Sequence, residues 1–315
     1  MGDAIEQRER SQSLIEALSA MRAGDLSQTR LLRLSDLSRD GARILAREWP
    51  SLPEDIRIGI VRRWEELTEE RVDLDFRRAL HVALDDASPV VRQLAICGLW
   101  EDDTTELFDR LLTILDDDPS SDVRAEAATA LGRYSQRAAS GSFAGDVTNA
   151  LREHLLRAAV DAEAAYAVQR RSLESLGPFA DEAEVAAAID EAFDAGDHGL
   201  RCSAIAAMGQ SRNLRWLPEI LGELENEEPE LRFESARSAG LLGSADALPP
   251  LLEAARDEDS EVRHMAISAI GQIGGRGAVR ALERLAEDAR EADFELIESA
   301  IEEVNALVEP FPSSS

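Results

Sequence analysis

Arginines and carboxylates recur in this sequence at a regular interval, and together they are the residue types that form bidentate ion pairs. The arginines are Arg92, Arg124, Arg201, Arg232 and Arg263, and Gln169 takes the equivalent place once. Six residues before three of them stand Asp86, Asp118 and Asp257. An acid in the turn of one repeat can accept both arms of the planar guanidinium of a neighbouring repeat. We therefore expect a structural ladder of alternating aspartate and arginine.

The residue types that usually carry catalysis or bind metals are scattered along the chain. The four histidines, which fall in separate repeats, are His81, His154, His198 and His264. Cys97 and Cys202 belong to no Cys-x-x-Cys or zinc-type spacing. The sequence also contains no His-Glu-x-x-His motif, no Gly-x-Ser-x-Gly elbow and no phosphate loop. We predict no catalytic residue, no metal site and no cofactor.

The elements that position the arginines are amphipathic helices. Residues 257–282 show the pattern, since Val262, Ala266, Ala269, Ile270 and Ile273 are spaced by steps of 3 or 4 and share one helical face. Glycines end this helix, and a second apolar pattern follows. The same register returns at intervals of 31 or 32 residues, with one step of 45. Such a period is typical of a helical solenoid.

A glycine stands eight residues after the repeated position in all but one of the repeats, where Trp100 replaces it. These glycines are Gly132, Gly177, Gly209, Gly240 and Gly271. We expect them to permit a close approach of adjacent helices or to bend a helix end.

The run acid-x5-Arg-x2-Ala-x2-Ala-apolar-Gly resembles HEAT repeats, in particular the short HEAT-like type named for bilin (phycobilisome) lyases. The resemblance covers Leu31 to Leu307. It implies an all-α fold, a right-handed α-solenoid (superhelix) of about eight two-helix repeats. The predicted parts are an N-terminal capping helix over 1–28, the solenoid over 29–308 and a disordered tail over 309–315.

Two segments depart from the regular pattern. Arg30–Trp49 is predicted as one helix, paired with Pro53–Leu67. Ser135–Val147 makes the long step of the array and is rich in serine, alanine and glycine. We interpret it as a flexible loop or as an extension of the helix that follows it.

Composition limits the classes of partner. Acidic residues number 63 against 34 basic ones, for a formal charge of −29, and every basic residue is arginine. Codon bias explains the absence of lysine, and a salt-adapted acidic surface is the other explanation. The negative electrostatic potential of such a chain repels nucleic acid and anionic membranes, so we predict that it binds neither. The N-terminal ten residues have no apolar signal core, and no apolar run reaches spanning length. We predict a cytoplasmic protein.

The resemblance places the second helix of each pair on the concave surface, where a partner would bind. At outward positions of these helices the sequence is less acidic than elsewhere and carries several arginines. We predict that a protein or peptide partner contacts Arg62, Arg133, Arg171, Glu174, Gln210, Arg237 and Gln272.

Three functions are compatible with such a solenoid. The first is a non-enzymatic scaffold or adaptor that binds a protein or peptide on its concave face. The alternative, implied by the resemblance, is a bilin-lyase-like enzyme or enzyme subunit. The third is a HEAT-like DNA glycosylase, which depends on a cationic concave surface, and the charge of −29 argues against it.

Overall fold

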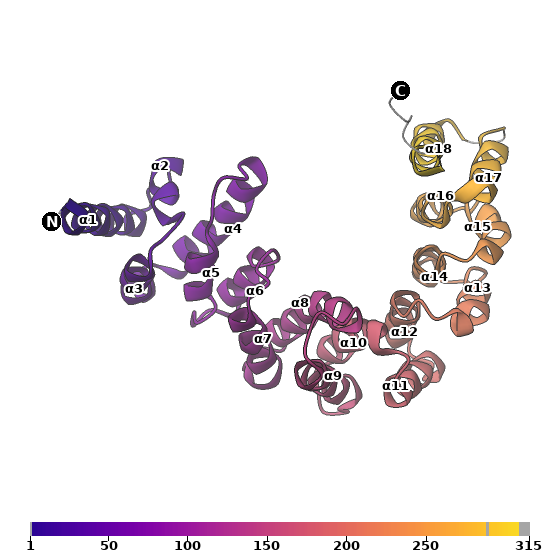
Figure 1. Cartoon of the computed structure of the whole chain (residues 1–315), viewed down its shortest axis with the longest axis horizontal. Helices are drawn as coiled ribbons and strands as arrows, with labels where there is room; N and C mark the ends of the chain where they lie inside the picture. Colours follow the sequence, from indigo (N-terminus) through magenta and orange to yellow (C-terminus); the bar gives the residue numbers. More distant parts are fainter. Residues whose placement is uncertain (1, 288–289, 309–315) are drawn as a thin grey trace, which may run out of the picture. The chain divides into compact units, whose positions relative to one another are not determined.

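The computed structural model describes residues 2–287 and 290–308 (Figure 1). Within these ranges the chain forms 18 α-helices joined by turns and short 3-10 helices, with no strand. The predicted all-α fold class is confirmed. The contacts divide the chain between Leu131 and Gly132 into two compact units. The predicted tail, 309–315, lies outside the described residues, and the predicted boundary at residue 28 stays a prediction.

The first unit is built from seven helices and the first part of an eighth. Its helices are α1 (Gly2–Arg22), α2 (Gln28–Leu31), α3 (Arg39–Glu48), α4 (Glu54–Glu70), α5 (Arg77–Ala83), α6 (Pro89–Gly98) and α7 (Thr105–Asp117). Helix α8 (Ser121–Ala139) contains the division. Three stacked aromatic rings fill the core of this unit, with centroids 5.8 Å apart for Trp49 and Trp64 and 5.6 Å apart for Trp64 and Phe76.

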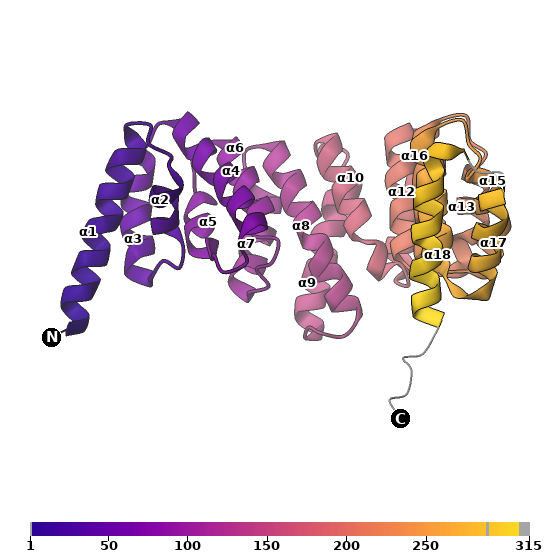
Figure 2. The ribbon, with the colours of Figure 1, turned by 90° about the horizontal axis from the view of Figure 1, so that it is seen from above.

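The second unit continues the repeat. Its helices are α9 (Gly145–Val160), α10 (Tyr166–Ser175), α11 (Ala183–Asp194), α12 (His198–Gln210), α13 (Leu217–Glu223), α14 (Pro229–Leu242), α15 (Leu248–Ala254), α16 (Ser260–Ile273), α17 (Gly275–Glu287) and α18 (Phe294–Val308). The even-numbered helices pack against one another in sequence and form one row, which we call the inner row because it lies on the inner side of this unit's curve (Figure 1). The odd-numbered helices form the outer row (Figure 1). Figure 2 shows that the axes of the inner-row helices α12, α16 and α18 are roughly parallel.

The repeated glycines let the inner-row helices approach closely. A Cβ atom added to Gly209 would lie 2.6 Å from the Cβ of Ser238, and one added to Gly240 would lie 2.9 Å from the Cβ of Ala269. Gly177 meets the backbone oxygen of Ala207 in the same way, at 2.6 Å. Each glycine therefore faces the small residue that stands six places after the repeated position in the next helix. No larger side chain fits there without displacement of the backbone.

The prediction of one helix over Arg30–Trp49 is wrong. Helix α2 ends at Leu31, a 3-10 turn spans Leu32–Leu34, and α3 begins only at Arg39. Asp36 adopts a left-handed conformation with φ of 50°, and its backbone N–H donates to the carbonyl oxygen of Asp75 at 2.7 Å. Ser38 then caps α3 by accepting a bond from the N–H of Gly41. The apolar pattern thus continues across a break in the helix.

The interpretation of Ser135–Val147 also needs correction. The preceding helix, α8, runs on to Ala139, so the first part of the insertion extends that helix, while residues 145–147 belong to the following helix, α9. A short turn leads from Ala139 to α9, which begins at Gly145.

Candidate functional site

The ladder arginines lie on second helices and reach acids in the turn of the following repeat. Arg92 donates to both carboxylate oxygens of Asp118 at 2.8 and 2.7 Å, and Arg232 donates to both oxygens of Asp257 at 2.7 and 2.8 Å. Arg92 also donates from Nη1 to the backbone carbonyl of Asp86, in its own turn. Each guanidinium therefore ties two successive turns together with planar, two-armed bonds.

Three further pairs extend this arrangement. Asp86 accepts from Arg57 at 2.7 and 3.1 Å and from the indole N–H of Trp49 at 2.6 Å. Arg263 donates to Asp293 at 3.0 Å, and Asp293 also lies 2.9 Å from the imidazole of His264. Arg201 takes Glu223 as its partner at 3.1 Å, because Asn226 occupies the turn position where the other repeats carry an acid.

The ladder is interrupted where the interval lengthens to 45 residues. Arg124 donates to the backbone carbonyl of Asp118, in its own turn, and has no carboxylate partner in the part of the chain that the structure describes. Gln169 likewise bonds only to carbonyls of its own turn, those of Asp161 and Ala164. These two positions flank the division between the compact units. The ladder pairs described above therefore connect turns within one unit.

Two of the ladder acids, Asp257 and Asp293, are held in their ionised form. Burial opposes ionisation of Asp257, but the hydrogen bonds from Arg232 outweigh it and hold the pKa of this carboxyl below its usual range. Asp293 shows the same balance, since bonds from Arg263 and His264 overcome its burial and lower its pKa. These groups are placed to stabilise the stack.

Six of the seven predicted partner-binding residues belong to the second unit, where they lie on α8, α10, α12, α14 and α16. Arg171 donates to Glu174 at 2.7 Å, one turn along α10. Glu174 also accepts from the hydroxyl of Ser203 on α12, which in turn accepts from Arg170. The predicted pair is therefore part of a polar network that links two inner-row helices.

Arg237 is neutralised in a similar way. It donates three bonds to the carboxylate of Glu234, the shortest at 2.6 Å. Burial nevertheless raises the pKa of Glu234 above its usual range. Gln272 is exposed, and its amide oxygen lies over Gly240. The structure thus brings residues of neighbouring helices together on this face, and it pairs the predicted cations with carboxylates of the same face.

The remaining predicted residues are Arg133, Gln210 and Arg62. Arg133 packs its guanidinium 5.0 Å from the ring centroid of Tyr134. Gln210 is partly exposed at the end of α12. Arg62 is exposed on α4 and belongs to the first unit.

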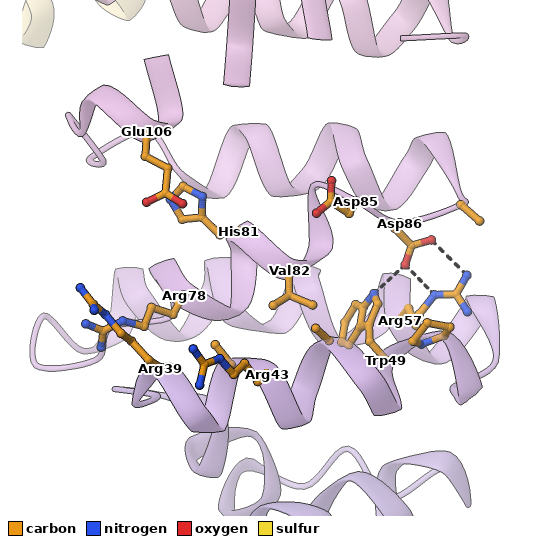
Figure 3. Close-up of a pocket in the computed structure, with 14 residues that line it drawn as sticks. Arg39, Arg43, Trp49, Arg57, Arg78, His81, Val82, Asp85, Asp86 and Glu106 are labelled. Atoms are coloured by element: carbon orange, nitrogen blue, oxygen red, sulfur yellow. Dashed lines mark hydrogen bonds and ion pairs between the residues drawn. The ribbon is translucent and has the colours of Figure 1, made fainter. Parts of the chain in front are cut away.

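A cavity of ≈ 620 Å³ lies between α3 and α5 in the first unit (Figure 3). Arg39 and Arg43 enter it from α3, and Arg78 enters from α5. We call this site the arginine pocket. Figure 3 shows these three side chains at one end, while the Arg57–Asp86 pair occupies the other. The repeated sequence pattern did not predict this site.

The arginines at the two ends of the arginine pocket differ in whether they pair with a carboxylate. Arg78 donates to the backbone carbonyl of Leu37 at 2.6 Å, and Arg43 pairs with Asp40 at 2.9 Å. Within the described residues, neither Arg39 nor Arg78 forms an ion pair with a carboxylate. Apolar groups of Ala42, Ala46, Val82, Ala87 and Pro50 line the space between the ends. His81, Asp85 and Glu106 also line the cavity, so the pocket combines guanidinium donors, an apolar wall and carboxylates.

One group of side chains could hold a metal ion. The ligand atoms of His198, Cys202 and Glu230 all lie within 4.8 Å of one another. Burial and the neighbouring carboxylate of Glu230 raise the pKa of the Cys202 thiol to about 11. His198 and Glu230 are 32 residues apart, so their proximity is a product of the helix stack.

Comparison with known sequences identifies a family. The sequence profile described as HEAT repeats matches residues 77–162 and 217–302, which together exceed half of the chain. The predicted resemblance to HEAT repeats is thereby confirmed. No curated protein sequence matches the chain significantly. None of the described helices combines the length and hydrophobicity needed to cross a membrane.

Several solved structures are similar to this chain at low identity. The complex of CpcE and CpcF of phycocyanin lyase from Nostoc sp. is 16% identical, with a TM-score of 0.49, covering 72% of this chain and 94% of that one. Human deoxyhypusine hydroxylase is 16% identical, with a TM-score of 0.36 and coverage of 96% and 99%. An engineered protein is 17% identical, with a TM-score of 0.40 and coverage of 63% and 96%.

Proposed function

Because this chain belongs to the HEAT-repeat family, we propose that it is a non-enzymatic scaffold that binds a protein partner, with the arginine pocket as the anchor for a carboxylate-bearing segment. The observation that carries the proposal is the gathering of Arg39, Arg43 and Arg78 at one end of a cavity in a chain of charge −29. Of these three, Arg39 and Arg78 have no carboxylate partner among the described residues, so their guanidinium groups can donate to an incoming anion.

The shape of the arginine pocket supports a peptide segment as the ligand. A side chain of a partner can lie along the wall formed by Ala42, Ala46 and Val82 while an adjacent carboxylate meets Arg39 and Arg78. Such recognition combines burial of apolar area with charge-assisted hydrogen bonds, which contribute about 1.5–3 kcal/mol each. The chain as a whole carries a formal charge of −29, so an acidic segment is repelled by most of the surface and is favoured where unpaired arginines gather.

The face of α10, α12 and α14 is the other proposed contact surface, as the sequence analysis expected. The pairing of Arg171 with Glu174 and of Arg237 with Glu234 leaves less charge for a partner there. We therefore assign the anchoring role to the arginine pocket.

The test measures the binding of a fluorescent peptide that alternates glutamate with leucine, by fluorescence anisotropy. The control peptide carries glutamine in place of each glutamate. We expect the Arg39→Glu/Arg78→Glu variant to bind the acidic peptide at least about tenfold more weakly than the wild-type protein, since two charge-assisted contacts become repulsive.

The Arg276→Glu/Arg280→Glu variant is the matched control, because it changes the net charge equally at two exposed arginines of α17. We expect it to bind within about twofold of wild type. Equal weakening in both variants would mean that only net charge matters. A selective loss in Arg171→Glu/Arg237→Glu would instead move the site to the inner row, and a small anion that displaced the peptide completely would favour a small-molecule ligand.

A further inference from the structure

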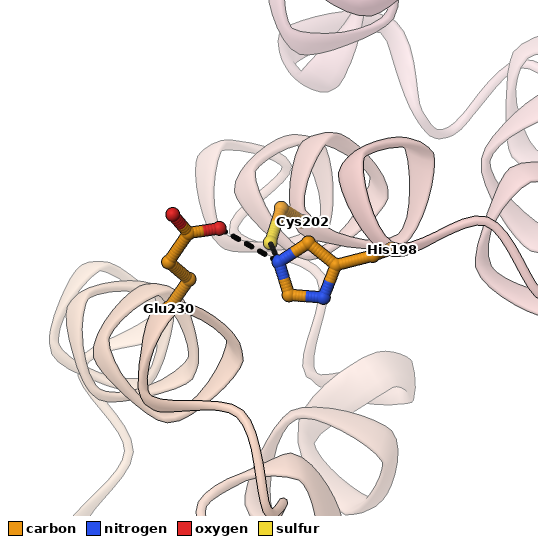
Figure 4. A group of neighbouring side chains, drawn as sticks. All are labelled: His198, Cys202 and Glu230. Atoms are coloured by element: carbon orange, nitrogen blue, oxygen red, sulfur yellow. Dashed lines mark hydrogen bonds and ion pairs between the residues drawn. The ribbon is translucent and has the colours of Figure 1, made fainter.

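Three different ligand-type side chains converge on the inner row of the second unit. His198 is the first residue of α12, and Cys202 follows four residues later (Figure 4). Residues four apart on a helix share a face, and this spacing is the one found for paired ligands on zinc-binding helices. The Sγ atom of Cys202 lies 3.9 Å from Nε2 of His198.

The third side chain comes from the next helix of the row. Glu230 is the second residue of α14, which packs against α12. One of its carboxylate oxygens lies 2.7 Å from the same Nε2 of His198. Figure 4 shows the carboxylate, the thiol and the imidazole directed toward one another from the two helices. Two packed helices, rather than a loop, therefore determine the geometry of the cluster.

The spacing of the three atoms is close to that of a coordination sphere. Zinc bonds are about 2.0 Å long to nitrogen, about 2.1 Å to oxygen and about 2.3 Å to sulfur. In a tetrahedral site these bond lengths place the nitrogen about 3.6 Å from the sulfur and about 3.3 Å from the oxygen. The His198–Cys202 pair differs from this by about 0.3 Å, and the His198–Glu230 pair must open by about 0.6 Å. The Glu230 side chain is 79% exposed, so it can move without repacking of the core.

The donor set also selects a class of ion. A neutral imidazole, a thiolate and a carboxylate together balance a charge of two. Sulfur and nitrogen donors favour zinc, cobalt and nickel over magnesium and calcium. The carboxylates of Glu234 and Glu174 act on the same thiol and add negative potential, opposed by the guanidinium of Arg170. Three protein ligands leave a fourth position for water or for a group of another molecule.

We propose that His198, Cys202 and Glu230 form a site for a divalent transition-metal ion, with zinc as the ion that fits the donor set best and with one coordination position open to solvent. The site is in the second unit, whereas the arginine pocket is in the first. A result that refutes one of the two proposed sites therefore leaves the other unaffected.

The test uses cobalt as a spectroscopic substitute for zinc, titrated into the full chain with both thiols reduced. A thiolate ligand produces a charge-transfer band in the near ultraviolet, and a tetrahedral site produces visible ligand-field bands. We expect both to saturate at one cobalt per chain and to disappear on addition of zinc. Cys202→Ser should abolish the charge-transfer band, while Cys97→Ser, which changes the other cysteine, should keep it.

The two remaining ligands are tested by His198→Ala and Glu230→Gln, each expected to weaken cobalt binding by about tenfold or more. His154→Ala, on α9, is the matched control and should bind cobalt as the wild type does. The far-ultraviolet circular dichroism of each variant shows whether it is folded. A wild-type titration without a charge-transfer band, a band that survives in Cys202→Ser, or a band lost in Cys97→Ser would each overturn the proposal.

Discussion

Replacement of Arg263 by alanine tests whether the arginine–acid ladder stabilises the helix stack. The side chains of Arg263 and Asp293 are only 7% and 5% exposed. Arg263 donates to Asp293 at 3.0 Å and, from Nη1, to the backbone carbonyls of Asp257 and Glu258 at 3.1 Å each. Alanine removes all three bonds at once and leaves a buried carboxylate without its guanidinium.

The expected loss follows from this geometry. Removal of one partner of a buried pair lowers the free energy of unfolding by about 3–5 kcal/mol. His264 still lies 2.9 Å from Asp293 after the change, so a value near 3 kcal/mol is expected. Arg263→Lys keeps the charge but loses the two-armed fork, so its loss should be intermediate, at about 1–2 kcal/mol.

The assay is urea unfolding followed by circular dichroism at a helical wavelength, with the slope checked between variants. Arg276→Ala is the matched control, because Arg276 is exposed on α17 and forms no ion pair among the described residues. It should change the stability by no more than about 0.5 kcal/mol. If Arg263→Ala unfolds within that margin of the control, the ladder does not stabilise the stack and the reasoning is refuted.

Two further predictions concern the same stack. Gly209→Ala should lower the free energy of unfolding by about 1–3 kcal/mol, because the added Cβ would lie 2.7 Å from the Cα of Ser238. Gly222→Ala is the control, because the space around Gly222 is open, and it should raise the free energy of unfolding by up to about 1 kcal/mol. Equal urea midpoints for these two variants would contradict the close-approach argument. The lowered pKa of Asp257 means that its pair with Arg232 stabilises fully above about pH 4 and is lost as the pH falls through the folded-state pKa. Urea unfolding between pH 3 and 7 should therefore show a weaker acid dependence in Asp257→Asn, and an unchanged dependence would exclude this role for Asp257.

Much of the fold could be predicted because its determinants are local. The helix predicted from the apolar spacing between Val262 and Ile273 corresponds to α16, and the predicted helix Pro53–Leu67 corresponds to α4, which begins one residue later. Apolar spacing, turn glycines and prolines act within a few residues of the chain. The break before α3 was missed because Asp36 is bonded to Asp75, and that bond exists only once two helices have packed.

The candidate sites were less accessible to sequence reasoning. Arg39, Arg43 and Arg78 lie outside the repeated register, although the four-residue spacing of the first two was a signal that they share a helical face. The sequence analysis predicted no metal site, because no single motif contains His198, Cys202 and Glu230. His198 stands three residues before Arg201 and Glu230 stands two residues before Arg232. This similar place in successive repeats was the available signal, since such positions of stacked helices are neighbours.

By itself, the sequence determined the class of fold, the register of the repeats and the small residues that let the inner-row helices approach, because periodic apolar patterns and glycines act through local geometry. Only the tertiary structure decided which charges are neutralised and which are available. Arg171 and Arg237 are bound by Glu174 and Glu234, while Arg39 and Arg78 face a cavity. Ion pairing and coordination depend on a few ångströms between side chains of neighbouring helices, and spacing along the chain does not specify those distances.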